Sequence, residues 1–171
     1  MVTDTRTFIE MSVREPEIVQ VQLEELITKV LGSLQTLERF KSISAEIDLD
    51  RAAPVILGDK REMESMLHQL LLNSFEATDP KNPYLRITSK TYPILPNRVQ
   101  IEIFNTGIPI KKEELETLFS PFFSTKFYGT GFGLPIAELA VKKNYGKLEL
   151  QSLPNKGTKI IVTLPSIEIS G

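Results

Sequence analysis

The sequence contains no cysteine and only one histidine, His68. The absence of cysteine excludes disulfide bonds, thiol nucleophiles and cysteine-ligated metal sites, and it is compatible with a reducing compartment. No apolar run approaches the ~20 residues that a membrane-spanning helix needs, and the opening MVTDTRTFIEM lacks the basic and apolar regions of a secretory signal. We therefore expect a cytoplasmic chain that makes no membrane contact itself, whether or not a parent protein is anchored by another segment.

An excess of positive charge is also missing. Lysine and arginine number 20 against 22 aspartate and glutamate residues, which gives a net charge of -2, and the basic residues are scattered. A nucleic-acid-binding protein usually carries a basic patch or stripe, so we expect no nucleic-acid partner. The 171 residues, of which 41% are hydrophobic and 25% charged, suffice for one globular domain with a core and a short appended segment.

Hydrophobic spacing and turn residues predict the order of the elements. Apolar side chains recur at intervals of three and four from Leu23 to Leu37, which is typical of a helix with one buried face. Asp59 stands where a helix N-cap belongs, and DPKNP ends the helix that follows. The expected helices are 3–15, 23–42, 60–78, 111–119 and 134–146, and the expected strands are 18–23, 43–50, 54–58, 84–92, 98–104, 147–153 and 158–165. This order predicts an α/β (α+β) two-layer sandwich, a mixed β-sheet with helices on one face.

A glycine-rich stretch precedes the last long helix. SPFFSTKFYGTGFGLPIAELA, residues 120–140, places Gly129, Gly131 and Gly133 before that helix, with Pro135 tolerated in its first turn. Free N–H groups and the positive end of the dipole make a helix N-terminus an anion site, and Lys126 upstream can reach a phosphate. The stretch is neither a Walker A motif nor a dinucleotide fingerprint. These residues alone are therefore compatible with two interpretations, a phosphate-binding loop and a plain flexible loop.

Five segments occur in the order of known motifs: HQLLLNSFEAT (68–78), FNTGIPI (104–110), LFSPFFSTK (118–126), GTGFGL (129–134) and NKGTKIIVTLP (155–165). They resemble the N box, first glycine box, F box, second glycine box and terminal Gly-Thr of the GHKL ATP-binding superfamily. The phenylalanine-rich box most resembles the catalytic and ATP-binding domain of bacterial sensor histidine kinases. The resemblance covers roughly residues 19–165 and implies a Bergerat-type ATP-binding fold over residues 17–166, followed by a C-terminal tail, 167–171.

The resemblance implies ATP and Mg²⁺ as cofactors and gives roles to individual residues. Asn73 matches the asparagine that holds Mg²⁺ against phosphate oxygens, an arrangement that suits a hard cation with few protein ligands. Thr158 matches a threonine that reaches adenine through water. The implied nucleotide-binding residues are Asn73, Ala77, Asn105, Gly107, Ile110, Lys126, Thr130, Gly131, Phe132, Gly133, Leu134 and Thr158, and the implied catalytic residues are Asn73, Lys126 and Gln69.

Gln69 bears on the reaction. It lies one helical turn before Asn73, where hydrolytic relatives of the superfamily place a glutamate that activates water. An amide cannot act as a general base, so attack by water should be slow. The γ-phosphoryl group would then survive for transfer to another nucleophile, as a kinase requires.

The sequence departs from the family pattern at three positions. Asn105 stands where the first glycine box opens with an aspartate, Pro109 replaces the second glycine of that box, and Glu76 replaces a lysine or arginine that meets the γ-phosphate in many members. An amide still accepts a hydrogen bond from adenine, as asparagine does in DNA grooves. A degenerate nucleotide-binding scaffold without phosphotransfer is the alternative, and an anti-sigma-type serine kinase is a second one that the F box disfavours.

The phosphoacceptor expected of the family is missing. His68 lies inside the N-box helix and is followed by Gln69 instead of an acidic residue, so we interpret it as a packing residue of that helix. Residues 1–16 resemble the tail of a dimerisation and phosphoacceptor hairpin or a linker. We therefore expect a protein-histidine kinase catalytic domain of a two-component system that is inactive alone. It would phosphorylate a histidine-bearing dimerisation domain, in the same parent protein or in trans, and serve a response regulator indirectly.

Overall fold

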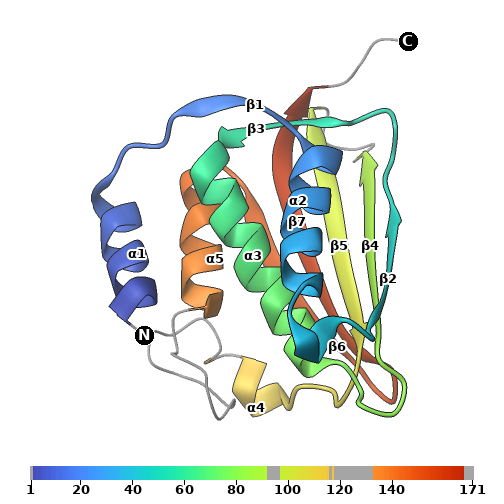
Figure 1. The fold of residues 1–171 in the computed structure, drawn as a ribbon. Coiled ribbons are helices and arrows are strands. Elements are labelled where there is room, and N and C mark those ends of the chain that lie inside the picture. The colour runs from blue at the N-terminus through green and yellow to red at the C-terminus, as the bar shows by residue number, and fades with distance from the viewer. Residues whose placement is uncertain (1, 92–96, 116, 118–132, 168–171) are drawn as a thin grey trace.

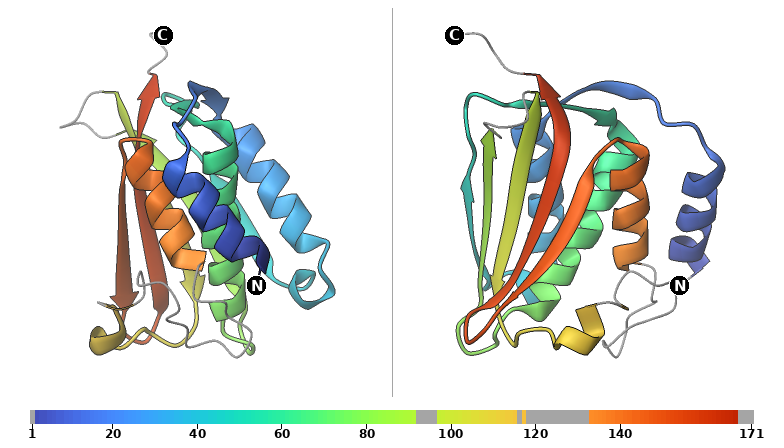
Figure 2. Two further views of the ribbon diagram at one scale, coloured as in Figure 1. Left: turned by 90° about the vertical axis from the view of Figure 1, so that its left-hand side faces the viewer. Right: turned by 180° about the vertical axis from the view of Figure 1, so that it is seen from behind.

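The structure of the protein is a computed structural model that describes residues 2–91, 97–115, 117 and 133–167 (Figure 1). Helices α2, α3 and α5 cover one face of a single sheet, and α1 lies on the outer side of α5 (Figure 2). The prediction of a two-layer sandwich with helices on one face is therefore confirmed. The elements are α1 (Val2–Val13), β1 (Ile18–Gln22), α2 (Leu23–Gln35), the 3-10 turn η1 (Glu38–Phe40), β2 (Ser44–Asp48), β3 (Val55–Asp59), α3 (Lys60–Ala77), β4 (Tyr84–Thr91), β5 (Arg98–Thr106), α4 (Lys112–Leu115), α5 (Gly133–Lys143), β6 (Lys147–Leu153) and β7 (Gly157–Ile167).

The sheet is mixed, as its sequence predicts. Its strands run in the order β1-β3-β7-β5-β4-β2, with β6 pairing along β7. Strand β2 is parallel to β4, and all the other described pairs are antiparallel. Strand β5 pairs with β7 along its whole length, from Arg98 opposite Pro165 to Thr106 opposite Gly157. This long pairing makes β5 and β7 the centre of the sheet.

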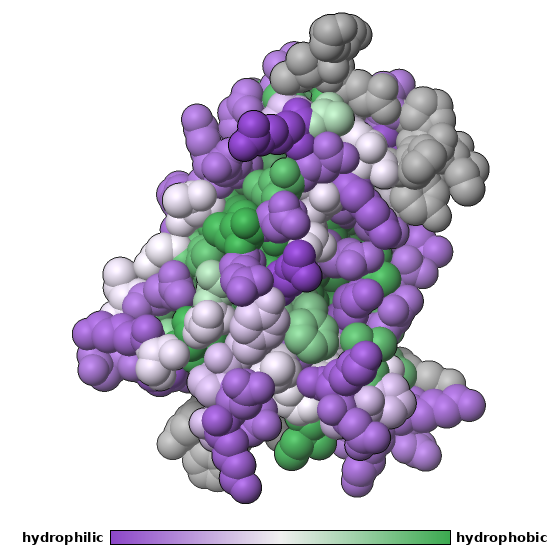
Figure 3. Space-filling model, turned by 90° about the vertical axis from the view of Figure 1, so that its right-hand side faces the viewer, coloured by the Kyte–Doolittle hydropathy of each residue, from purple (hydrophilic) through white to green (hydrophobic). Residues whose placement is uncertain are grey.

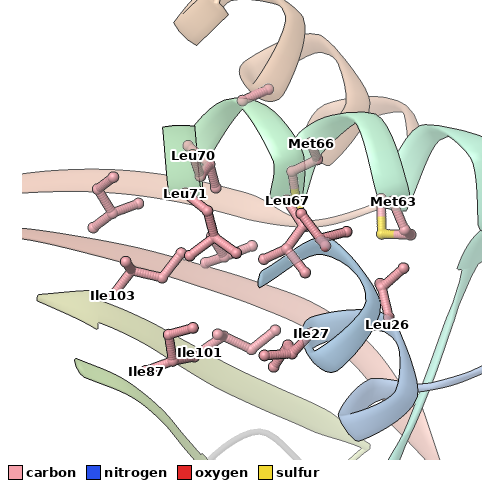
Figure 4. Close-up of a cluster of buried hydrophobic side chains, with 14 of the residues drawn as sticks. Leu26, Ile27, Met63, Met66, Leu67, Leu70, Leu71, Ile87, Ile101 and Ile103 are labelled. Carbon is pink, nitrogen blue, oxygen red and sulfur yellow. The ribbon is translucent and has the colours of Figure 1, made fainter. Parts of the chain in front are cut away.

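The core fills the space between the sheet and the helices. Every second residue of β5 is buried, as expected of a strand whose one face is covered. Facing this row, α2 and α3 contribute aliphatic and methionine side chains that interdigitate with it (Figure 4). The buried residues shown there include Leu26, Ile27, Met63, Met66, Leu67, Leu70, Leu71, Ile87, Ile101 and Ile103.

The opposite face of the sheet is polar. Cross-strand ion pairs join Arg86 to Asp48 at 3.4 Å and Glu102 to Lys90 and Lys159 at 3.5 and 3.6 Å. Hydrophilic side chains also surround smaller hydrophobic areas on the side of the molecule shown in Figure 3. None of the helices in the described part of the chain is long and apolar enough to cross a membrane.

The predicted helix over residues 23–42 is too long. Helix α2 ends at Gln35, and η1 follows after two residues. The Thr36 hydroxyl donates to the Ser33 carbonyl at 2.7 Å, a local bond that competes with helix continuation. The turn also lets Phe40 stack on Phe75 of α3 at 5.0 Å between ring centroids. The apolar residues beyond Gln35 therefore do not extend the helix. Phe40 instead lies in a 3-10 turn that packs on α3.

Candidate functional site

Two polar side chains end the buried rows of the sheet. Asn105 on β5 lies directly opposite Thr158 on β7, next to the apolar pair Ile103 and Ile160. Asn105 is 1% exposed and Thr158 is 4% exposed. The Asn105 side-chain amide donates to the Thr106 carbonyl at 2.9 Å, which orients its oxygen away from that carbonyl. The sheet therefore offers two adjacent buried hydrogen-bonding side chains at this end, on neighbouring strands.

Gly107 brings the end of α3 against the end of β5. Its φ is +148°, and a Cβ atom there would lie 2.0 Å from the backbone carbonyl oxygen of Ala77. Only glycine fits such a close approach in such a conformation. Gly157 resembles it, with φ at +149° and a Cβ position 1.9 Å from the Asn105 carbonyl oxygen. Close backbone packing therefore joins Ala77, Asn105 and Gly107, three of the predicted site residues.

Helix α3 presents its remaining site residues along one line. Gln69, Asn73 and Ala77 follow at four-residue intervals, which places them on one face of the helix, and all three are half-buried. A Cβ atom on Gly133, the first residue of α5, would lie 3.1 Å from the Gln69 side-chain oxygen. The N-terminus of α5 therefore lies beside the line of Gln69 and Asn73.

The start of α5 agrees with its prediction from sequence. The helix begins at Gly133, with Leu134 and Pro135 buried in its first turn. Its first backbone N–H groups have no partner within the helix and carry its positive dipole end. Ile110 lies half-buried between β5 and α4, three residues beyond Gly107. Lys126, Thr130, Gly131 and Phe132 lie outside the described residues, so the nucleotide-binding roles implied for them stay predictions.

One neighbour of the site was not anticipated from the sequence. Arg39 of η1 approaches the Glu76 carboxylate at 4.0 Å and lies 4.6 Å above the Phe40 ring. Glu76, which replaces a cation in the family pattern, therefore has a positive charge beside it. Nothing in the sequence pointed to this pair, because the two residues belong to different elements and the predicted helix placed Arg39 on α2.

Comparisons with known proteins agree with this geometry. Residues 58–168 match the family described as histidine kinase-, DNA gyrase B-, and HSP90-like ATPase. Among curated relatives, Sporulation kinase C of Bacillus subtilis is 31% identical over 146 residues, and Sensor histidine kinase ZraS of Klebsiella oxytoca is 29% identical over 145 residues. The alignments cover 84% and 85% of this chain but only 33% and 31% of those relatives, so the chain spans about a third of their length.

Solved structures that resemble this chain also include histidine kinases. The catalytic domain of histidine kinase ThkA has 31% sequence identity and a TM-score of 0.75, with 87% of this chain and 95% of that one covered. Full-length ShkA in complex with AMPPNP has a TM-score of 0.83 over 99% of this chain and 36% of that one. At 20% identity this second likeness concerns the fold only. The resemblance inferred from the five motifs is confirmed: the chain belongs to the GHKL family of histidine kinase-, gyrase B- and HSP90-like ATPases and is similar to sensor histidine kinase catalytic domains.

Proposed function

We propose that this domain binds Mg-ATP between α3, the N-terminus of α5 and the Asn105 end of the sheet, and that it donates the γ-phosphoryl group to a histidine of a dimerisation domain. The observation that carries the proposal is the convergence at one end of the molecule of Asn73, Gly107 and Gly133, which come from three separate motifs. Family membership supports ATP binding and a kinase role, and the geometry suits them.

The adenine base would meet Asn105. Because the side-chain nitrogen of Asn105 donates to the Thr106 carbonyl, its oxygen is left to accept a hydrogen bond from an exocyclic amino group. Thr158 lies opposite and adds a hydroxyl at the same depth. Replacing the family's charged hydrogen-bond acceptor, aspartate, by the neutral asparagine should reduce the binding free energy of ATP by about 1 kcal/mol. This corresponds to somewhat less than a tenfold loss of affinity. The departure at Asn105 thus predicts weaker ATP binding but not its loss.

The phosphate end would lie between α3 and α5. The Asn73 side chain supplies an oxygen ligand for Mg²⁺, which prefers oxygen and keeps phosphate oxygens and water as its other ligands. The free N–H groups at the start of α5 attract anionic oxygens. We assign Lys126 to neutralising the charge of the phosphates. The segment that wraps the triphosphate, which we call the lid, would comprise Thr130, Gly131, Phe132, Gly133 and Leu134. The pocket for the adenine base would be formed by Ala77, Gly107 and Ile110.

Gln69 determines what happens to the γ-phosphoryl group. Its side chain lies beside Gly133 and carries no proton acceptor strong enough to activate water. In the proposed reaction the bond from the γ-phosphorus to its bridging oxygen breaks and a bond to a histidine ring nitrogen forms. ADP leaves with the bonding electron pair, and the ring proton passes to solvent.

The acceptor must come from outside the described site. His68 is half-buried on α3, the same helix that carries Asn73, so it cannot move in line behind a phosphate that this helix binds. A separate histidine-bearing dimerisation domain, in the same parent protein or in trans, is therefore the proposed partner. A response regulator would take the phosphoryl group from that domain.

A nucleotide-binding scaffold without phosphotransfer is the second candidate. It is favoured by Asn105 and by Glu76, whose negative charge faces Arg39 instead of a phosphate. In such a protein ATP or ADP would change the conformation of the domain, and no phosphoryl group would reach a protein acceptor.

Calorimetric titration and labelling test the proposal. Mg-ATP and Mg-ADP should bind with micromolar to low millimolar affinity, and Asn73→Ala should remove the Mg²⁺ dependence. Ser65→Ala, two turns earlier on α3, is the matched control and should retain the dependence. A protein that binds neither nucleotide at millimolar concentration refutes the proposal.

Labelling with γ-labelled ATP distinguishes the candidates. The domain alone should remain unlabelled, and an added histidine-bearing hairpin should acquire acid-labile, base-stable label. Label on His68 would contradict the acceptor argument, and label on serine of an added protein would favour an anti-sigma-type kinase. Nucleotide binding without any label would favour the scaffold.

A further inference from the structure

A buried cluster of charged and polar side chains lies at the far ends of α3 and α5 from the candidate site. Asp59 and Glu62 belong to the start of α3, whereas Lys143 and Asn144 belong to the end of α5. Arg14 reaches the cluster from the segment after α1. Both helices therefore connect the nucleotide site at one end to this cluster at the other, about 15 Å away along α5.

Asn144 joins the two helices. Its side chain is fully buried, its oxygen accepts from the Asp59 backbone N–H at 2.7 Å, and its nitrogen donates to Glu62 at 3.0 Å and to the Ala140 carbonyl at 2.7 Å. The oxygen and both N–H donors are thus used. Such a fully satisfied buried amide holds its neighbours in one arrangement. The end of α5 is therefore fixed to the start of α3.

Lys143 joins the same point to α1. Its side chain is 15% exposed, and its ammonium group donates to Glu62 at 2.9 Å and to the backbone carbonyls of Met11 and Arg14. An ammonium group has three donors, and these partners occupy all three. The last turn of α1 and the residue after it are therefore bound directly to α5.

Arg14 completes the cluster and balances its charge. It pairs with Asp59 and lies 3.5 Å from Glu62, so two cations face two carboxylates. Burial of the Asp59 carboxyl opposes its ionisation, but the backbone N–H groups of Glu17 and Glu62 and the Arg14 charge more than offset this and lower its pKa. Removing one member of such a buried group leaves an uncompensated charge and is strongly destabilising to the contact.

Helix α1 depends on this cluster. Met11 is 6% exposed and Phe8 packs on the core, but Ile9 and Val13 face outward, so only a narrow apolar stripe holds the helix. A helix of 12 residues is marginal in water by itself. The position of α1 on α5 is therefore set by few apolar contacts together with Lys143.

We propose that the cluster of Arg14, Asp59, Glu62, Lys143 and Asn144 is a joint that couples the docking of α1 to nucleotide binding at the opposite end of α5. The inference rests on the proposed nucleotide site. Helix α5 is one continuous helix whose first residue lies beside Gln69 and whose last residue, Lys143, holds α1. Docked α1 stabilises the orientation of α5 that binds nucleotide, and by thermodynamic reciprocity bound nucleotide stabilises docked α1.

Lys143→Met tests the joint, with Lys142→Met as the matched control. Lys142 is the preceding residue of α5 and loses the same charge, but its side chain is 70% exposed and pairs with Glu138 on its own helix. Met11→Glu is a second variant that expels α1 through its apolar contact and leaves every charged side chain of the cluster in place. The readouts are hydrogen exchange of the α1 amides without nucleotide and calorimetric titration with Mg-ADP.

Both Lys143→Met and Met11→Glu should reduce α1 protection at least about tenfold and raise the Kd of Mg-ADP about fivefold, within the usual range of coupling between sites. The double variant should bind Mg-ADP no more weakly than the single ones, because both act through α1. Saturating Mg-ADP should increase α1 protection in the wild type. The control should match the wild type throughout.

Three results would overturn the inference. One is unchanged α1 protection in both variants, which would show that the cluster and the Met11 contact do not hold α1. Another is lost protection with a Kd of Mg-ADP within twofold of the wild-type value, which would leave α1 uncoupled while nucleotide binding stands. The third is a wild-type protein that does not bind Mg-ADP, which removes the proposed function and this inference with it.

Discussion

Replacing Gly107 by alanine is expected to damage both the fold and the nucleotide site. Gly107 has φ at +148°, a conformation that costs an alanine about 1–3 kcal/mol. The new methyl group would also lie 2.0 Å from the Ala77 carbonyl oxygen, where a backbone atom at the end of α3 must move. Overpacking of this kind costs a further 1–3 kcal/mol, roughly, and we take about 3 kcal/mol as the combined loss.

The expected loss corresponds to a measurable shift. For a protein of this size each kcal/mol lowers the Tm by roughly 2–4 °C, so Gly107→Ala should lower it by roughly 6–12 °C. Because relief of the clash separates Ala77 from β5, the variant should also bind Mg-ADP more weakly than the wild type. Differential scanning calorimetry and isothermal titration measure the two effects.

Gly32 provides a control of opposite sign. It lies inside α2, and a Cβ atom added there would meet nothing within 4 Å. Gly32→Ala should therefore stabilise the protein by about 0.5–1 kcal/mol, because alanine loses less backbone entropy in a helix. A Gly107→Ala variant that melts within about 1 °C of the wild type and binds Mg-ADP equally well would refute the reasoning.

Three further predictions concern single side chains. Asn105→Asp should tighten Mg-ADP binding by somewhat under tenfold in calorimetry, since it restores a charged acceptor where we propose that the Asn105 oxygen meets the base, and an unchanged affinity would count against that orientation. Gln69→Glu should raise phosphate release from ATP at least about tenfold in the absence of an acceptor, because a carboxylate can activate water, and an unchanged rate would remove Gln69 from the reaction. The lowered pKa of Asp59 means that its ionised form stabilises the fold above about pH 4 and that this stabilisation is lost as the pH falls through the folded-state pKa. Urea denaturation of Asp59→Asn should therefore show a shallower loss of unfolding free energy below about pH 4 than the wild type shows, and an equally steep loss would contradict the assignment.

The sequence correctly predicts those elements and motifs that are set by residues close together in the chain. Alternation in β5, the N-cap at Asp59 and the start of α5 at Gly133 all appear where the sequence predicts them. Each is set by interactions within a few residues, such as the Asp59 carboxylate accepting from the Glu62 N–H at 3.0 Å. The ordered motifs also carried the family assignment, which the comparisons confirm.

Other features depended on residues that meet only when the chain folds. Beyond the end of α2 at Gln35 the chain turns so that Phe40 stacks on Phe75, a contact that the apolar spacing of residues 23–42 does not reveal. The approach of Gly107 to the Ala77 carbonyl and the pairing of Asn105 with Thr158 depend on strand register. Arg39 beside Glu76 and Lys143 beside Met11 join elements far apart in the chain.

The sequence by itself therefore determined the fold class, the order of the motifs and the family, because periodicity, capping and glycine placement act locally. The tertiary structure alone decided which motif residues converge, how the Asn105 amide is oriented and how α1 is attached. The convergence and the attachment depend on hydrogen bonds and packing between residues 30 to more than 100 positions apart, such as Lys143 with the Met11 carbonyl, which lies 132 positions earlier, whereas the amide orientation follows from a bond to the adjacent Thr106 carbonyl in the folded strand. No local pattern specifies such pairs, because their partners are chosen by the register and packing of whole elements.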